Sequence, residues 1–188
     1  MKKQTVSLKF RRRMEGKTNF VKRLAFVKSG MDRLVLRKSN KSISAQVVRY
    51  DEKGDKVICS ANSKELEKLG WPSRSNRPTA YLLGLYIASK MDEKDRKKEH
   101  VLDIGLSSPV ANSIPFVFAK GCKDAGIGLR SNIEIDDSYY NAKSISTYNE
   151  SKPNKNGNQF GKYEKVDQLN TLFNDIREKL KLSVSKNK

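Results

Sequence analysis

The sequence predicts an α/β fold: a mixed, mostly antiparallel sheet with packed helices, a basic N-terminal arm and a C-terminal helical extension. Two observations predict the core. Residues 33–61 alternate between apolar and polar positions, as half-buried strands do, and long apolar segments with helical punctuation follow them. A third observation predicts the arm and the extension: the charge and the spacing of hydrophobic residues change at both ends of the chain. With 188 residues, the chain can bury one sizeable core without disulfides.

Positive charge is concentrated at the N-terminal end. The chain carries 39 Lys and Arg against 21 Asp and Glu, a formal net charge of +18. Residues 1–41 hold 14 of these basic residues against two acidic ones, whereas residues 42–149 hold 16 against 14. A near-neutral body with a basic arm indicates a polyanionic partner, and nucleic acid is the partner we expect.

The arm has little apolar periodicity before a short helix predicted from Phe20, which Ser29-Gly30 would end. The run Glu15-Gly16-Lys17-Thr18-Asn19 has the composition of a shaped turn into that helix, which a merely charged tail would not need. Because residues 1–20 contain few apolar groups, we predict that they are disordered without RNA.

Three antiparallel strands should follow as a meander. They are predicted at 33–38, 43–50 and 57–61, with turns at 39–42 and 51–55. In the first strand Leu34 and Leu36 should face the core, which places Arg33, Val35 and Arg37 on the other face. Arginines on that face fit either RNA contact or simple exposure to solvent.

Helices and one further strand complete the predicted core. Asn62 and Glu65 form a capping-box pattern that opens a short helix closed by Gly70. The remaining elements are an apolar helix over 78–91, a solvated charged loop over 92–99, a buried strand over 100–106 and a helix over 113–126. Gly84 in the apolar helix predicts tight packing on a sheet face.

The C-terminal part changes character twice. Residues 131–163 are rich in Asn, Ser and Lys, which predicts an irregular surface extension. A helical period returns near Glu164, with one apolar face formed by Val166, Leu169, Leu172, Phe173, Ile176 and Leu180. The predicted organisation is therefore an arm over 1–32, an α/β core over 33–130 and an extension over 131–188.

Several kinds of chemistry find little support in the composition. Cys59 and Cys122 lack metal-type spacing and fit a reducing compartment as small core residues, and there is a single histidine, His100. No secretory signal is visible, and the most apolar segment is too short to cross a bilayer. We expect a cytoplasmic protein with no cofactor, metal, membrane or small-molecule substrate.

Asp103 raises an enzymatic alternative. An aspartate after a buried strand, followed by Gly and Ser, resembles the phosphate loop of actin-like ATPases and the first metal ligand of ribonuclease-H-like nucleases. Both chemistries need further carboxylates around a metal, and the three strands of the meander supply none. We therefore expect Asp103 to cap a loop or a helix start.

The ordered motifs resemble the archaeal and eukaryotic form of the large-subunit ribosomal protein eighteen family. The resemblance rests on EGKTNFVKRL, RLVLRKSNKSISAQVVRYDEKGDKVICSANSKELEKLGW, RPTAYLLGLYIASK, LDIGL and FAKGCKDAGI, and covers roughly residues 8–130. Two places depart from the family pattern. SSPVANSIPFVFA lacks the usual Gly-Ser, and Leu129-Arg130-Ser131 replaces Pro-His, so family contacts there are not carried over.

The resemblance implies a non-enzymatic ribosomal protein that binds 5S rRNA and helps attach it to the large-subunit rRNA in the central protuberance, beside other large-subunit proteins. Recognition would depend mainly on RNA shape. Phe20 fits either a base stack or an anchor for the arm. The residues expected to contact RNA are Arg11, Arg12, Arg13, Lys17, Thr18, Asn19, Phe20, Lys22, Arg23, Arg37, Lys38, Asn40, Lys41, Arg74 and Asn76. A non-specific RNA chaperone is the other alternative to be tested.

Overall fold

The computed structural model describes residues 8–72, 74–131, 133–151 and 168–186. Within these residues five strands form one sheet in the order β3-β2-β1-β4-β5. The strands are β1 (Asp32–Lys38), β2 (Ile43–Arg49), β3 (Lys56–Asn62), β4 (Glu99–Asp103) and β5 (Gly128–Leu129). The first three are antiparallel neighbours, whereas β4 runs parallel to β1 and β5 parallel to β4. The predicted meander and mixed sheet are confirmed, and β5 is an addition.

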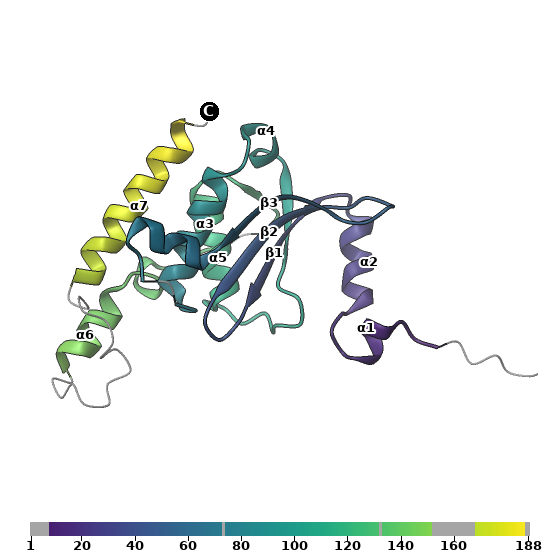
Figure 1. The fold of residues 1–188 in the computed structure, drawn as a ribbon, viewed down its shortest axis with the longest axis horizontal. Helices are drawn as coiled ribbons and strands as arrows, with labels where there is room; N and C mark the ends of the chain where they lie inside the picture. Colours follow the sequence, from purple (N-terminus) through teal and green to yellow (C-terminus); the bar gives the residue numbers. More distant parts are fainter. Residues whose placement is uncertain (1–7, 73, 132, 152–167, 187–188) are drawn as a thin grey trace, which may run out of the picture.

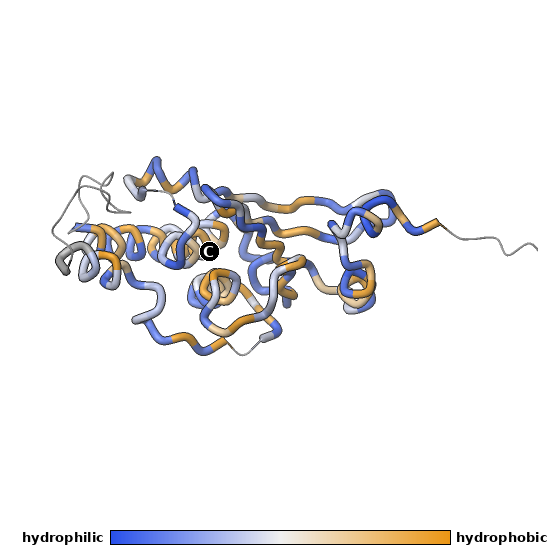
Figure 2. Tube along the Cα trace, turned by 90° about the horizontal axis from the view of Figure 1, so that it is seen from below, coloured by the Kyte–Doolittle hydropathy of each residue, from blue (hydrophilic) through white to orange (hydrophobic). Residues whose placement is uncertain are grey.

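Side-chain alternation separates the two faces of this sheet. Leu34 and Leu36 of β1 are buried in the core together with Ile43, Ala45 and Val47 of β2. The polar positions between them lie on the other face, and the trace through the sheet carries both hydrophobic and hydrophilic positions (Figure 2). One face therefore carries the core, and the other is left to carry Arg33 and Arg37.

Helices α3 (Arg77–Ser89) and α5 (Ile114–Asp124) cover the core face and cross each other closely. A Cβ at Gly84 would lie 2.5 Å from the carbonyl oxygen of Phe118, and one at Gly121 would lie 2.4 Å from that of Tyr81. Both glycines thus allow backbone contact between the helices. The tight packing expected at Gly84 is real, but its partner is α5 and not the sheet.

Short helices fill the connections. The helix η1 (Ser63–Leu69) has the predicted capping box, in which Glu65 accepts from the backbone N–H of Asn62, and ends at a left-handed Gly70. The charged run after α3 was expected to be a solvated loop, and most of its side chains are exposed, but part of it is helical and one side chain is buried. It contains α4 (Glu93–Arg96), and Arg96 is buried because its guanidinium donates a 3.0 Å hydrogen bond to the carbonyl of Val184.

The first and last helices described lie at opposite ends of the molecule (Figure 1). The N-terminal end holds α1 (Arg11–Met14), which was not predicted, and α2 (Phe20–Lys28). The C-terminal end holds η2 (Asp137–Tyr139), α6 (Lys143–Ser151) and α7 (Leu169–Lys186). The prediction of an irregular segment is therefore wrong over 137–139 and 143–151, and residues 152–163 lie outside the described residues.

Helix α7 packs against α3. Leu169, Phe173, Ile176 and Leu180 are buried, as the apolar period predicts, and the Phe173 ring lies 5.9 Å from that of Trp71 and 5.8 Å from that of Tyr81. Val166 of the predicted face lies outside the described residues. Cys122 is fully buried in the same core, whereas Cys59 is only half-buried.

Candidate nucleic-acid interface

A basic cleft lies between the N-terminal arm and the sheet. Its volume is about 470 Å³. Its walls come from α1 and α2 on one side and from β1, Asp103 and the loop after β4 on the other. The lining includes seven basic residues and one acid: Arg12, Lys17, Lys22, Arg23, Arg33, Arg37, Lys38 and Asp103. This excess of cations in a concave surface favours a polyanion as its ligand.

The arm owes its shape to the predicted turn. Gly16 adopts a φ of +63°, which a glycine tolerates without strain. The Oδ1 atom of Asn19 accepts from the backbone N–H groups of Val21 and Lys22 and so caps the start of α2. The Nε of Arg12 donates to Oγ1 of Thr18 over 2.8 Å. These bonds fix the turn between the two helices, so that α1 lies at the N-terminal end of α2 (Figure 1) and both contribute to one wall of the cleft.

Phe20 contacts Phe10 of the arm and, within the described part of the chain, no core aromatic ring. Its ring lies 5.4 Å from that of Phe10, with the two planes inclined by 36°. Phe10 itself is largely exposed. The pair therefore braces the arm internally, and base stacking by either ring remains a prediction.

An aspartate ties α2 to the sheet. One carboxylate oxygen of Asp55, in the loop between β2 and β3, accepts from Nη2 of Arg23 at 2.7 Å and from Nη2 of Arg33 at 2.6 Å. Since α2 has no buried residue, this double ion pair is a principal tie between the arm and the body.

A second aspartate holds the arginine on the opposite wall. Arg37 donates from Nη1 to the carbonyl oxygens of Leu36 and Asp103, and from Nη2 to the Asp103 carboxylate at 3.2 Å. The same Asp103 oxygen accepts from the backbone N–H of Gly105, so the predicted loop-capping role is confirmed. Its oxygens face two guanidiniums, and the described residues contain no cluster of three His, Cys, Asp or Glu that could hold a metal.

Most of the remaining cations around the cleft are not neutralised. Among the described residues, no ion pair is formed by Arg12, Arg13, Lys22, Lys38 or Lys41. Lys17 pairs with Glu15 at 2.8 Å, and hydrogen bonds from Arg11 and Lys17 lower the pKa of that carboxyl. Unpaired, exposed cations are the groups that phosphates can reach at the lowest desolvation cost.

The structure brings together eight of the fifteen residues expected from the sequence. The eight that line the cleft are Arg12, Lys17, Thr18, Asn19, Lys22, Arg23, Arg37 and Lys38. Arg11, Arg13 and Phe20 lie on the helices of the same arm, and Asn40 and Lys41 lie in the turn between β1 and β2. Whether each of them contacts RNA remains a prediction.

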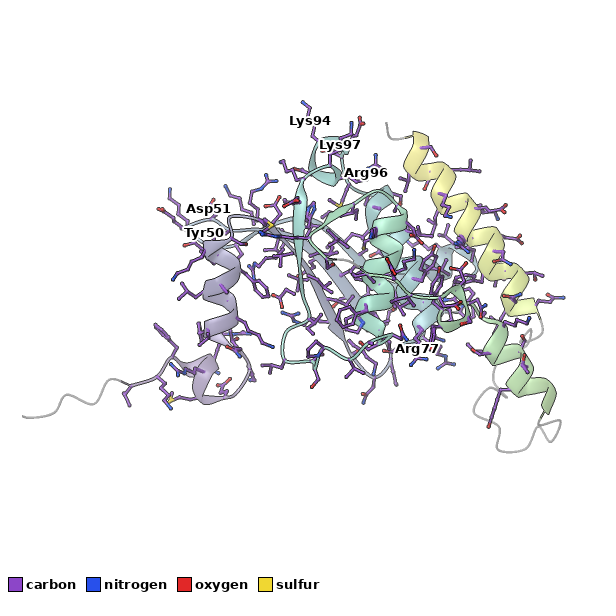
Figure 3. All side chains as sticks on the ribbon, turned by 180° about the vertical axis from the view of Figure 1, so that it is seen from behind. Tyr50, Asp51, Arg77, Lys94, Arg96 and Lys97 are labelled. Atoms are coloured by element: carbon purple, nitrogen blue, oxygen red, sulfur yellow. The ribbon has the colours of Figure 1, made fainter. Side chains whose placement is uncertain are left out.

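Arg74 and Asn76 do not line the cleft, although Asn76 lines a neighbouring pocket that shares Lys38 and Ser107 with it. Arg74 and Asn76 precede α3, and the neighbouring Arg77 lies at the base of that helix, away from α1 and α2 (Figure 3). The Oδ1 atom of Asn76 accepts from the backbone N–H of Thr79, so its carbonyl serves as the helix cap. Sequence reasoning missed Arg33 and the loop Ile104–Ser107 as parts of the cleft. The alternation of Arg33 with Leu34 was the one signal that could have placed it there.

Comparison with known proteins identifies the family. A family model described as "Ribosomal large subunit proteins 60S L5, and 50S L18" matches residues 4–100. The large ribosomal subunit protein uL18 of Methanococcus maripaludis is 44% identical over 145 residues, which cover 76% of this chain and 75% of that protein. The chain belongs to this family. It is therefore a structural component of the large ribosomal subunit in the cytoplasm, as the resemblance predicted, and not an enzyme.

Membership of the uL18 family changes how Asp103 is understood. A nuclease or ATPase centred on this residue is excluded by the family, and the pairing with Arg33 and Arg37 gives it a structural explanation. None of the described helices combines the length and the hydropathy that crossing a bilayer requires.

Proposed function

We propose that this uL18-family chain binds 5S rRNA and helps attach it to the large-subunit rRNA in the central protuberance. The observation that carries the proposal is the basic cleft, whose cations come from two independent walls. Arg12 and Lys22 project from the arm, and Lys38 comes from the end of β1. A single RNA backbone entering the cleft would meet cations on both sides.

This arrangement supports recognition of shape more than of base identity. A-form RNA hides most base edges in a deep, narrow groove, so cations at fixed positions select the path of the phosphates. The arm (1–32) would supply most of the electrostatic attraction, and the core (33–130) would supply the rigid wall. Neighbouring large-subunit proteins would contact the remaining surface, including the extension over 131–188.

Titration of 5S rRNA across a salt series tests the proposal. The full chain and a chain lacking residues 1–23 are compared, with an unrelated structured RNA as competitor. Each phosphate contact contributes about −0.7 to −0.9 to the slope of log affinity against log salt. We expect 5S rRNA to win the competition and the deletion to weaken binding and flatten the slope. Equal binding of the competitor would contradict 5S specificity and support the alternative of a non-specific RNA chaperone.

Single substitutions separate the cleft from general charge. Lys22→Ala and Lys38→Ala each remove one unpaired cation from opposite walls, and Lys94→Ala removes an exposed one from α4, far from α1 (Figure 3). We expect the two cleft variants to reduce the salt slope by about one contact each. The Lys94 variant should match the unmodified chain, and equal effects at all three positions would contradict the cleft as the binding site.

The attachment role needs a three-component measurement. Labelled 5S rRNA is mixed with a large-subunit rRNA fragment from the central protuberance, with and without the protein. We expect retention of 5S rRNA on the immobilised fragment only when the protein is present. Retention that is equally strong without it would contradict the bridging role while leaving 5S binding intact.

A further inference from the structure

Five charged side chains of alternating sign form a continuous chain along the cleft, and all of them except Asp55 line it. The order is Arg23, Asp55, Arg33, Asp103 and Arg37, with nitrogen-to-oxygen distances of 2.7, 2.6, 3.5 and 3.2 Å along it. The series begins on α2, continues through the loop between β2 and β3, the start of β1 and the end of β4, and ends on Arg37 of β1. It therefore connects the two walls of the cleft through ion pairs whose partners are up to 70 positions apart in the sequence, as Arg33 and Asp103 are.

Burial changes systematically along this chain. The side chains at its ends are about half exposed, 42% for Arg23 and 50% for Arg37. The central Arg33 is only 7% exposed, and Asp103 is 9% exposed. Buried charges are tolerated when they are paired, and here every inner charge has partners on both sides. The exposed ends are the parts that a ligand can reach.

We propose that Asp55 and Asp103 are positioning residues, which fix Arg23 and Arg37 on opposite walls of the cleft for RNA phosphates. The inference rests on the proposed RNA-binding function and assigns these two acids a role in it. A guanidinium has five N–H donors, and three of those of Arg37 are used by the carbonyl oxygens of Leu36 and Asp103 and by the Asp103 carboxylate. The two N–H donors that remain belong to a guanidinium whose orientation is already fixed. Binding a phosphate therefore costs less conformational entropy.

The proposal makes a prediction whose sign opposes simple electrostatics. Removing a carboxylate near a polyanion should tighten binding if the carboxylate acts only through its charge, because Asp103 lies well within a Debye length of the cleft. Removing a positioning carboxylate should weaken binding, because Arg37 then loses its fixed orientation. Asp103→Asn tests this directly, since the amide keeps the size of the side chain and an acceptor for the N–H of Gly105.

We expect Asp103→Asn to weaken 5S rRNA binding by about five- to tenfold, within the range of coupling between contacting residues. Glu15→Gln is the matched control, because Glu15 lies on the exposed arm and only neutralises Arg11 and Lys17. Its loss frees two cations, so it should tighten binding by about twofold. Unchanged or tighter binding by the Asp103 variant would overturn the proposal.

A double-mutant cycle shows whether Asp103 acts through Arg37. In an Arg37→Ala background, Asp103→Asn should produce no further weakening, whereas an equal further loss would overturn the proposal. Arg37→Lys leaves Asp103 intact and keeps the positive charge, but it cannot reproduce the three-point attachment. We expect it to weaken binding as Asp103→Asn does, and affinity equal to that of the unmodified chain would count against positioning.

Asp55→Asn and Arg23→Ala form the equivalent pair on the other wall, with the same expected non-additivity. The salt slope provides a readout that a merely structural role would not change. Loss of one phosphate contact should reduce the salt slope by the contribution of about one contact, while the melting temperature of the core stays unchanged.

Lys22→Ala separates the two proposals: if it weakens binding while Asp103→Asn tightens it, the cleft binds RNA without a positioning role for Asp103. If neither variant has an effect, the RNA-binding proposal itself fails.

Discussion

Helices α2 and α7 lie at opposite ends of the molecule and are held by different forces. Helix α7 buries Leu169, Phe173, Ile176 and Leu180 against the core, whereas no residue of α2 is buried. Val21 of α2 is 77% exposed, and the helix is tied to the body through the ion pair of Arg23 with Asp55. One helix is thus fixed by fully buried apolar side chains, and the other by an ion pair beside the half-buried Phe26 and Val27.

This difference separates stability from binding. Apolar burial contributes roughly 25 cal/mol for each Å² removed from water, and salt does not screen it. Exposed ion pairs contribute about 0–1 kcal/mol and are screened. An arm held in this second way adds little to the stability of the fold, and its exposed cations remain available for RNA. The C-terminal end can stabilise the core without competing for that role.

The largest effect is expected at the apolar end. Phe173→Ala removes a fully buried ring that contacts Trp71 and Tyr81, and should lower the free energy of unfolding by about 3–5 kcal/mol. Urea denaturation measures this loss. Leu182→Ala on the exposed side of the same helix is the control and should cost less than about 0.5 kcal/mol. Similar losses in both variants would contradict the packing described for α7.

A smaller effect is expected at the charged end. Arg23→Met breaks the ion pair with Asp55, which keeps its other partner, Arg33. Because Arg23 is 42% exposed, the free energy of unfolding should fall by less than about 1 kcal/mol. Amide exchange in α2 should become faster while that of α3 is unchanged. Lys28→Met in the same helix is the control, and a loss as large as that of Phe173→Ala would show that α2 belongs to the core.

The smallest effect concerns an ion pair at the packed end. Asp137 accepts a hydrogen bond from the Tyr140 hydroxyl and pairs with Arg177 of α7 at 3.6 Å. Both contacts lower the pKa of its carboxyl, and the hydrogen bond from Tyr140 has the larger effect. A lowered folded-state pKa stabilises the fold above the unfolded pKa of about 3.9, and this contribution is lost as pH falls through the folded pKa.

Asp137→Asn should therefore lower the free energy of unfolding by less than about 1 kcal/mol at pH 7, since the carboxylate is largely exposed. Once the pH is below the folded-state pKa, the substitution should have no effect. Thermal unfolding across pH 2–7 measures the difference. Asp175→Asn on α7, which makes no ion pair among the described residues, serves as the control. A difference that persists undiminished in acid would show that charge is not its origin.

The parts of the fold that the sequence predicted depend on local signals. Alternation of Leu34 and Leu36 with polar residues gave the first strand, and Asn62 with Glu65 gave the capped helix η1. The parts it did not predict depend on distant contacts. Arg96 is buried because the chain returns 88 residues later to offer the Val184 carbonyl, and β5 has only two residues. Neither leaves a periodic pattern.

The candidate site divides in the same way. The turn from Gly16 to Asn19 and the cations of the arm were predicted because Gly, Asn and Lys have local preferences that can be recognised. The pairing of Asp55 with Arg23 and Arg33 joins three distant segments, so no spacing indicates it. Asp103 was correctly expected to cap a loop, but its hold on Arg37 depends on the parallel pairing of β4 with β1.

The position of Trp71 has a spectroscopic consequence. It is the single tryptophan of the chain, it is buried, and its indole N–H donates to Thr79 while its ring meets Phe173 of α7 edge-on. Its emission therefore reports on the seam between α3 and α7. No arm residue is among its aromatic neighbours in the described structure. A fluorescence shift would signal release of the C-terminal helix, and RNA entering the cleft would leave the signal unchanged, so the protein carries a built-in probe for one of its two ends.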